Sequence, residues 1–168
     1  MPAPRPPQPA TPASDAFEIH RAQVADGMNL AYIREGVGGY PLLLVHGYPE
    51  TKRVWWRNIL PLAEAGFEVI VPDLRGYGDS DLSEKDEYDI VLYSKDLFAL
   101  VHDVLGHEKF GLIAGDVGGA VIVDMANRYA QHVDRMIFFN TVAPIVPDEP
   151  EWYAERGLSM NPLEHGPT

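Results

Sequence analysis

Asp116 is the residue whose type and surroundings best suit chemistry. It ends a short apolar run and is followed by Gly118 and Gly119, in the order Leu-Ile-Ala-Gly-Asp-Val-Gly-Gly-Ala over residues 112–120. This pattern predicts a strand, a sharp turn and a helix, and a side chain on such a turn stands clear of the sheet. The flanking positions, Ala114 among them, must be small because larger side chains would collide with the strand and the helix. A carboxylate placed there can attack carbon and form a covalent ester, which points away from a serine esterase.

Asp116 also has a purely structural interpretation. An Asp just before a helix is often an N-cap that accepts hydrogen bonds from the first free amides of the helix. The glycines beside it can mark only a tight turn, and short motifs of this kind have a high false-positive rate. The predicted elements around Asp116 are therefore needed to distinguish a catalytic nucleophile from a helix N-cap.

The surrounding chain alternates between strand and helix patterns. Two strands, 17–24 and 28–34, flank Ala25-Asp26-Gly27 and predict a hairpin. Later strands are expected over 42–45, 67–71, 110–113 and 133–139, and helices over 51–65, 88–105 and 118–130. The order predicts an α/β fold, with a mostly parallel sheet, an N-terminal antiparallel hairpin and helices on both faces. Because ligands bind at the carboxyl ends of such strands, loops 46–49 and 73–80 should meet the turn at Asp116.

Composition narrows the class of partner. The 168 residues are 46% hydrophobic and 10% aromatic, which suits a folded core, and 13 basic against 25 acidic residues give a net charge of −12. That charge repels phosphate backbones and anionic lipids, so neither nucleic acid nor a membrane surface is expected as a partner. The absence of cysteine removes disulfides and thiolate metal sites. No signal peptide or membrane-spanning run is visible, and a cytoplasmic location is the default expectation.

Three motifs together carry a family resemblance. They are HGYP at 46–49, DLRGYGDSD at 73–81 and AGDVGG at 114–119. The chain resembles the first part of an α/β-hydrolase, in the epoxide hydrolase and haloalkane dehalogenase group, over about residues 17–145. The resemblance implies that Asp116 is the nucleophile and that the backbone amides of Tyr48 and Val117 form an oxyanion hole. It also implies that His46, Gly47 and Pro49 shape the supporting loop, with a cis bond between Tyr48 and Pro49.

The resemblance favours an epoxide as the small-molecule electrophile. Haloalkane dehalogenases of this group usually place a halide-binding Trp after the nucleophile and Asn or Glu within the HGxP loop, where this chain has Val117 and Tyr48. Val117 also departs from the aromatic residue often seen in epoxide hydrolases, and a haloalkane dehalogenase-like hydrolase remains the alternative. Trp55 and Trp56 are expected in the core, and Arg75 is expected in a structural salt bridge with a loop acid.

The expected partners of the nucleophile are missing from the pattern. In the family, a His after the last strand activates the water that hydrolyses the ester, and an acid orients this His. No histidine has a suitable position among His20, His46, His102, His107, His132 and His165, and Asn140 cannot supply a negative charge. No cofactor is implied, and no metal site is expected because His107-Glu108 lacks a second His at metal-binding spacing.

The expected organisation has three parts. Residues 1–16, with six prolines, form a flexible tail, residues 17–143 form the first part of the hydrolase core, and residues 144–168 begin a cap or an irregular tail, with Tyr153 as a cap candidate. The chain is therefore expected to end before the cap and the last strands. An inactive fragment that self-associates through the open edge at 136–139 is the second hypothesis.

Overall fold

A six-stranded sheet organises the protein, with the strand order β1-β2-β4-β3-β5-β6. The computed structural model describes residues 10–13 and 15–141. The strands are β1 (His20–Gln23), β2 (Asn29–Glu35), β3 (Tyr40–Val45), β4 (Phe67–Pro72), β5 (Phe110–Gly115) and β6 (Val133–Phe139). The pairs β1–β2 and β2–β4 are antiparallel, whereas β4–β3, β3–β5 and β5–β6 are parallel. The predicted fold class is confirmed.

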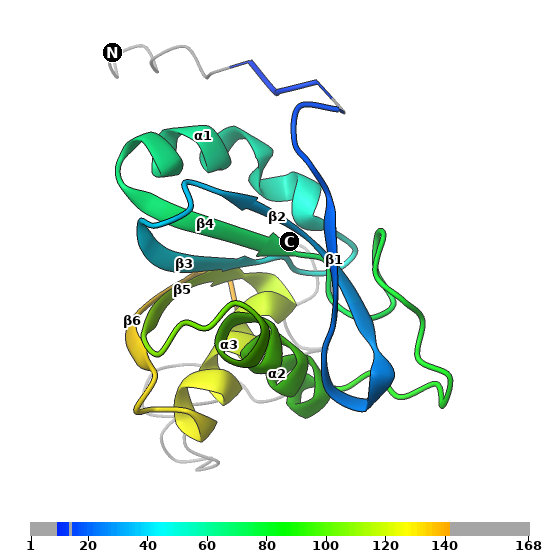
Figure 1. Ribbon diagram of the computed structural model, residues 1–168. Helices are drawn as coiled ribbons and strands as arrows, with labels where there is room; N and C mark the ends of the chain where they lie inside the picture. The colour runs from blue at the N-terminus through cyan, green and yellow to red at the C-terminus, as the bar shows by residue number, and fades with distance from the viewer. Residues whose placement is uncertain (1–9, 14, 142–168) are drawn as a thin grey trace, which may run out of the picture.

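Helices cover both faces of this sheet (Figure 1). The short 3-10 turns η1 (Ala25–Gly27) and η2 (Lys52–Trp55) precede β2 and α1, respectively. The α-helices are α1 (Trp56–Glu64), α2 (Ile90–Phe98) and α3 (Asp116–Arg128), and α2 continues into a π-helical segment, η3 (Ala99–Val104). Figure 1 shows α1 above the sheet and α2 and α3 together below it.

Two cores explain why the central strands are apolar without alternation. On β3, Leu43 and Val45 pack with the core shared by α2 and α3, whereas Leu42 and Leu44 pack with the core under α1. All four side chains are buried. A strand covered on both faces needs apolar side chains on both, and each fully buried one contributes about 1.5–3 kcal/mol.

The helix predicted over 51–65 is divided in the structure. Its first turn is the 3-10 segment η2, and α1 begins at Trp56 and runs through Pro61 to Glu64. Pro61 lacks the amide that would bond back within the helix, so α1 gives up one hydrogen bond and still continues.

The helix predicted over 88–105 begins later and changes type. Asp89 caps α2 by accepting a hydrogen bond from the Leu92 amide at 2.9 Å, so the helix starts at Ile90. From Ala99 the backbone widens to a π-helix, with the Leu105 amide bonded to the Leu100 carbonyl. Val104, an apolar residue within this segment, is 44% exposed. The 3.6-residue pattern therefore holds only for the first part of this helix.

Strand β6 is an edge of the sheet in the described part of the chain. Its end is apolar and accessible, since Ile137 is 59% and Phe139 53% exposed. Self-association through this edge stays a prediction. Most of the tail at 1–16 and the whole segment 144–168, with Trp152, Tyr153 and His165, lie outside the described residues. Within the described ranges, every helix is too short or too polar to span a bilayer.

Candidate active site

Asp116 lies at the sharp turn between β5 and α3, in a left-handed backbone conformation with φ +53°. Such a conformation costs a non-glycine residue about 1–3 kcal/mol, and such residues concentrate at functional sites. The turn is held from the next strand, because the Asp116 amide donates to the Asn140 carbonyl at 3.1 Å. Helix α3 begins with Asp116 itself, two residues earlier than the sequence pattern predicts, and its N-cap is Gly115.

The glycines around Asp116 have no room for a side chain. A Cβ at Gly118 would lie 2.4 Å from the His46 carbonyl oxygen, and one at Gly47 would lie 2.5 Å from the Asp116 Cβ. A Cβ at Gly119 would lie 2.6 Å from the Thr141 side chain. The small residues expected from the sequence are thus required where the loop, the strand and the helix approach one another.

The carboxylate of Asp116 points at two backbone amides. Its Oδ1 accepts from the Tyr48 amide at 2.9 Å and from the Val117 amide at 2.7 Å. These two hydrogen bonds lower the pKa of Asp116 below its usual range and favour the ionised form. An N-cap would instead accept from an amide two or three positions further along the helix. The arrangement is therefore that of an anion held between amides from two different loops.

The loop that supplies the Tyr48 amide is fixed by His46. The ring is 1% exposed, its Nε2 accepts from the Leu74 amide at 3.0 Å, and its Nδ1 donates to the Gly47 carbonyl at 2.8 Å. Burial is the main cause that lowers the pKa of His46, so the ring is held neutral. The bond between Tyr48 and Pro49 is cis. His46 thus ties its own loop to the one that follows β4.

A buried ion pair lies below these loops, and the sequence pattern gave no sign of it. Lys52 is 1% exposed, and its ammonium bonds to the carboxylates of Asp73 and Asp79. Asp73 also accepts from the Lys52 amide at 2.7 Å and the Asp79 amide at 2.8 Å. These bonds satisfy a fully buried carboxylate and hold loop 73–81 against the start of η2.

Arg75 forms the structural salt bridge that was expected, but with a different acid. Its Nε and one terminal nitrogen bond to the two carboxylate oxygens of Asp96, at 2.6 and 2.7 Å. Asp96 lies on α2, so the prediction of a loop acid was wrong. Position 96 falls on the buried side of α2, where only a paired carboxylate is tolerated.

A cavity of about 360 Å³ opens beside Asp116. Part of its wall comes from η2, α1 and the end of β6, and the sequence pattern did not predict that part. The lining residues are Val45, Glu50, Val54, Trp55, Asn58, Gly115, Asp116, Phe139 and Asn140. Trp55 and Phe139 meet edge to face with ring centroids 6.1 Å apart. Trp55 and Trp56 are also part of the core under α1, as expected.

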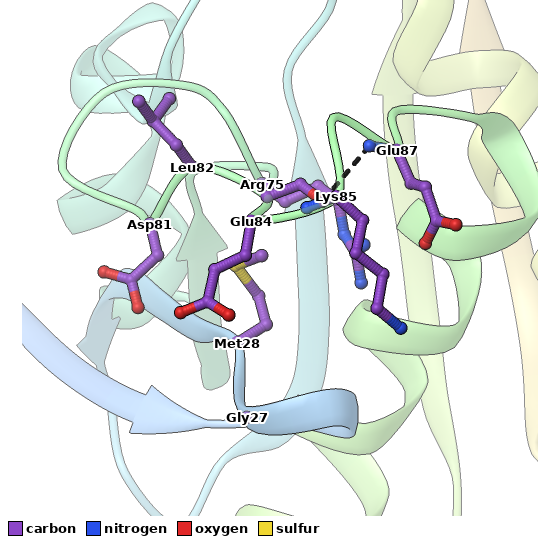
Figure 2. A pocket seen from close by; sticks show the side chains of 9 residues that line it. Gly27, Met28, Arg75, Asp81, Leu82, Glu84, Lys85 and Glu87 are labelled. Carbon is purple, nitrogen blue, oxygen red and sulfur yellow. Dashed lines mark hydrogen bonds between the residues drawn. The ribbon is translucent and has the colours of Figure 1, made fainter.

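A larger cavity of about 510 Å³ lies elsewhere, between the hairpin and loop 81–87. Figure 2 shows charged side chains around it, including Asp81, Glu84 and Glu87. Asp116 does not line it, and neither amide that holds the carboxylate reaches it. The smaller cavity is therefore the candidate active site, because Asp116 lines it.

Known proteins resemble this chain in sequence and in structure. The sequence matches the alpha/beta hydrolase fold family over residues 40–158. It is 34% identical over 129 residues to the soluble epoxide hydrolase of Corynebacterium sp. (strain C12), which covers 76% of this chain and 43% of that protein. It is 38% identical over 113 residues to epoxide hydrolase A of Mycobacterium tuberculosis, covering 66% of this chain and 34% of that one.

A solved structure agrees with these sequence matches. Epoxide hydrolase A from Mycobacterium thermoresistibile superposes with a TM-score of 0.72 at 30% identity, covering 84% of this chain and 44% of that structure. The chain thus spans less than half the length of each of these relatives.

Proposed function

The chain belongs to the α/β-hydrolase fold family, in its epoxide hydrolase group, and from this membership we propose that Asp116 opens epoxides through a covalent ester. One observation carries the proposal. The Oδ1 atom of Asp116 lies between the Tyr48 and Val117 amides, and Oδ2 has no hydrogen bond within the described residues. One oxygen is thus held and the other is available to attack carbon.

The first half-reaction forms the ester. The Oδ2 lone pair attacks an epoxide carbon, the Oδ2–carbon bond forms, and the carbon–oxygen bond of the epoxide breaks with its electrons moving to the epoxide oxygen. That alkoxide then takes a proton from an acid. Release of ring strain drives the step, and the ionised state of Asp116 that the two amides favour keeps the nucleophile ready at neutral pH.

The second half-reaction returns the carboxylate. Water loses a proton to a general base and attacks Cγ of the ester, and charge develops on Oδ1. The intermediate collapses with cleavage of the Cγ–Oδ2 bond, the leaving alkoxide takes up a proton to give the diol, and the carboxylate is restored with one oxygen from water. The two amides already bond to Oδ1, so they meet the developing charge without rearrangement. Loss of one such donor typically costs about 10²–10³ in rate.

The water needs a general base, and the described histidines do not offer one. Both ring nitrogens of His46 are engaged in hydrogen bonds, and His107 is bonded to Glu68. His102 and His132 lie near the opposite ends of the strands, and His20 begins β1. We therefore assign the attack on the epoxide carbon to Asp116, and the acid that protonates the alkoxide and the base that activates the water have to come from outside the described residues.

A covalent-trapping experiment tests the assignment. The protein is incubated with styrene oxide, and intact mass followed by peptide mapping locates any adduct. We expect one adduct on the peptide that contains Asp116, and none in Asp116→Ala. Asp86→Ala is the matched control, because Asp86 is also an Asp with positive φ, 56°, but lies in a turn away from the cavity.

Two outcomes would count against the proposal. A folded protein without an adduct at Asp116 would contradict the nucleophile assignment, as would an adduct of equal yield in Asp116→Ala. A parallel incubation with a chloroalkane separates the alternative, because a haloalkane dehalogenase-like protein would release halide from it and leave styrene oxide unchanged.

A further inference from the structure

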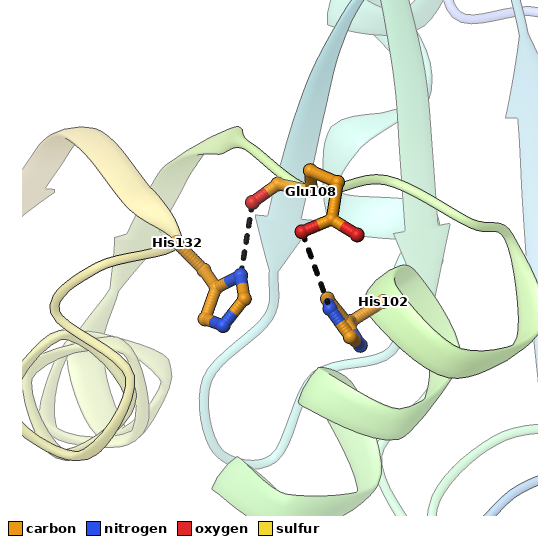
Figure 3. Close-up of side chains that lie close together, drawn as sticks. All are labelled: His102, Glu108 and His132. Atoms are coloured by element: carbon orange, nitrogen blue, oxygen red, sulfur yellow. Dashed lines mark hydrogen bonds and ion pairs between the residues drawn. The ribbon is translucent and has the colours of Figure 1, made fainter.

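Three potential metal ligands meet at the end of the sheet opposite to Asp116. His102 lies on η3, Glu108 precedes β5, and His132 lies between α3 and β6 (Figure 3). One potential ligand atom from each residue lies within 4.8 Å of the other two. The Glu108 carboxylate is 3.8 Å from Nε2 of His102. These residues lie in three separate segments of the chain, and only the fold brings them together.

Hydrogen bonds orient both imidazoles for metal binding. Nδ1 of His102 bonds to the carboxylate of Asp103 at 2.8 Å, and Nδ1 of His132 bonds to the Glu108 carbonyl at 2.9 Å. A neutral ring that donates from Nδ1 keeps the lone pair on Nε2. Metal-binding histidines commonly donate their other ring nitrogen to a carboxylate or carbonyl in this way. Each ring, when neutral, therefore has its Nε2 lone pair available for a cation.

Aromatic packing fixes the two rings. Phe98 stacks on His102 with centroids 4.7 Å apart and meets His132 edge to face at 5.1 Å. The other face of Phe98 is taken by Tyr129, with centroids 3.7 Å apart. His102 is 27% exposed, whereas Glu108 is 84% exposed. The two nitrogens are therefore held in place, and the carboxylate is free to adjust on the solvent side.

We propose that His102, Glu108 and His132 bind one divalent transition-metal ion, with Zn²⁺ as the probe. Two imidazoles and one carboxylate suit zinc and leave a fourth position for water. Tetrahedral zinc places its ligand atoms about 3.3 Å apart, closer than the 4.8 Å within which these atoms now lie, so metal binding has to draw the three side chains together. The ion would join η3, the start of β5 and the start of β6. The net charge of −12 attracts it to the protein.

Metal titration of the 168-residue protein, prepared without a tag and stripped with chelator, tests this site. Calorimetry with Zn²⁺ should give one ion per chain, and Co²⁺ should give the visible absorption of a tetrahedral complex. We expect His102→Ala and His132→Ala each to weaken Zn²⁺ binding by about 100-fold or more. Asp103→Asn, which weakens the orienting hydrogen bond and removes one negative charge beside His102, should weaken it by about 10-fold. His20→Ala, an imidazole outside the cluster, is the matched control.

The thermal transition gives a second measurement for any variant that folds less well. Zn²⁺ should raise the melting temperature of the parent protein and of His20→Ala, but not that of His102→Ala. Mg²⁺, which prefers oxygen ligands, should not raise the melting temperature of the parent protein or of His20→Ala. The proposal is overturned if Zn²⁺ does not bind, if the His102→Ala/His132→Ala double variant binds as tightly as the parent, or if Mg²⁺ competes equally.

Discussion

The two ends of β5 carry candidate sites that are built in different ways. At the carboxyl end, Asp116 sits in a left-handed turn, and its carboxylate is held by backbone amides. At the amino end, the side chains of Glu108, His102 and His132 supply the potential ligand atoms, and one backbone carbonyl, that of Glu108, orients His132. A Cβ at Gly118 would collide with backbone, whereas one at Gly106, near the histidines, would have nothing within 4 Å, and only the positive φ of 78° favours glycine there.

This difference shows which kind of site can be recognised from the sequence alone. A site made from backbone restricts its neighbours to small residues, so consecutive glycines and alanines reveal it. A site made from side chains restricts only its own members. Its neighbours are free to vary, and its members can be distant in the chain.

The largest expected effect concerns the charges that support the carboxyl end. Lys52→Met should cost about 3–5 kcal/mol of unfolding free energy, because it leaves the Asp73 carboxylate buried without its cation. Lys109→Met, at the amino end, removes a cation that is 56% exposed and 3.6 Å from Asp134. We expect that change to cost about 0–1 kcal/mol. Urea denaturation of both variants measures the contrast, and equal costs would contradict it.

The next largest effect compares Gly118, in α3, with Gly111, in β5. Gly118→Ala should cost about 1–3 kcal/mol, because the new Cβ meets the His46 carbonyl, although alanine is the better helix former. At Gly111 the nearest atoms to a new Cβ are the ends of the Leu42 and Tyr40 side chains, at 3.0 and 3.3 Å. These can move, so Gly111→Ala should cost less than about 1 kcal/mol. Thermal denaturation measures both variants. A larger loss of stability in Gly111→Ala than in Gly118→Ala would contradict the difference between the two ends of β5.

A smaller effect isolates the backbone strain at Asp116. Asp116→Gly and Asp116→Ala both lose the carboxylate, but only alanine keeps the left-handed penalty. We expect the glycine variant to be more stable by about 1 kcal/mol, and Asp86→Gly against Asp86→Ala to show a similar difference. Chemical denaturation measures both pairs. A glycine variant no more stable than the alanine variant would show that the turn at Asp116 is not strained.

The smallest effect is a pH dependence at the carboxyl end. Burial lowers the pKa of His46 in the folded protein, so the unfolded chain takes up the proton first as the pH falls. The contribution of His46 to stability is therefore complete above about pH 6.5 and decreases below it. Melting temperatures measured from about pH 8 down to about pH 5 should fall less steeply in His46→Gln. An unchanged slope in that variant would assign the dependence to other groups.

Much of the fold was predictable because its signals are local. The apolar runs at 42–45 and 110–113 correspond to β3 and β5, and the glycines beside Asp116 indicated the turn. The buried pair of Lys52 and Asp73 was not predictable, because a lysine at a helix start normally lies at the surface. Only the fold brings loop 73–81 over it.

The cluster of His102, Glu108 and His132 at the amino end of β5 was not predicted from the sequence, for a related reason. No metal site was expected from the sequence, because His107-Glu108 lacks a second His at short spacing. His102 and His132 are 30 positions apart, and Glu108 follows His107, which bonds elsewhere, to Glu68. The role proposed for Asp116 and its two amides also depends on distance, since Tyr48 and Asp116 are 68 positions apart.

The π-helical segment η3 has a consequence for insertions and deletions. A π turn carries one residue more than an α turn, and each residue of an α-helix turns the chain by about 100°. The wider turn takes up this extra residue, so deletion of one residue within 99–101 would close the stretch as an α-helix and leave the elements on either side in place. The fold would thus tolerate a change of length by one residue here. The position of His102 against His132 would change with it, because His102 lies within the widened stretch.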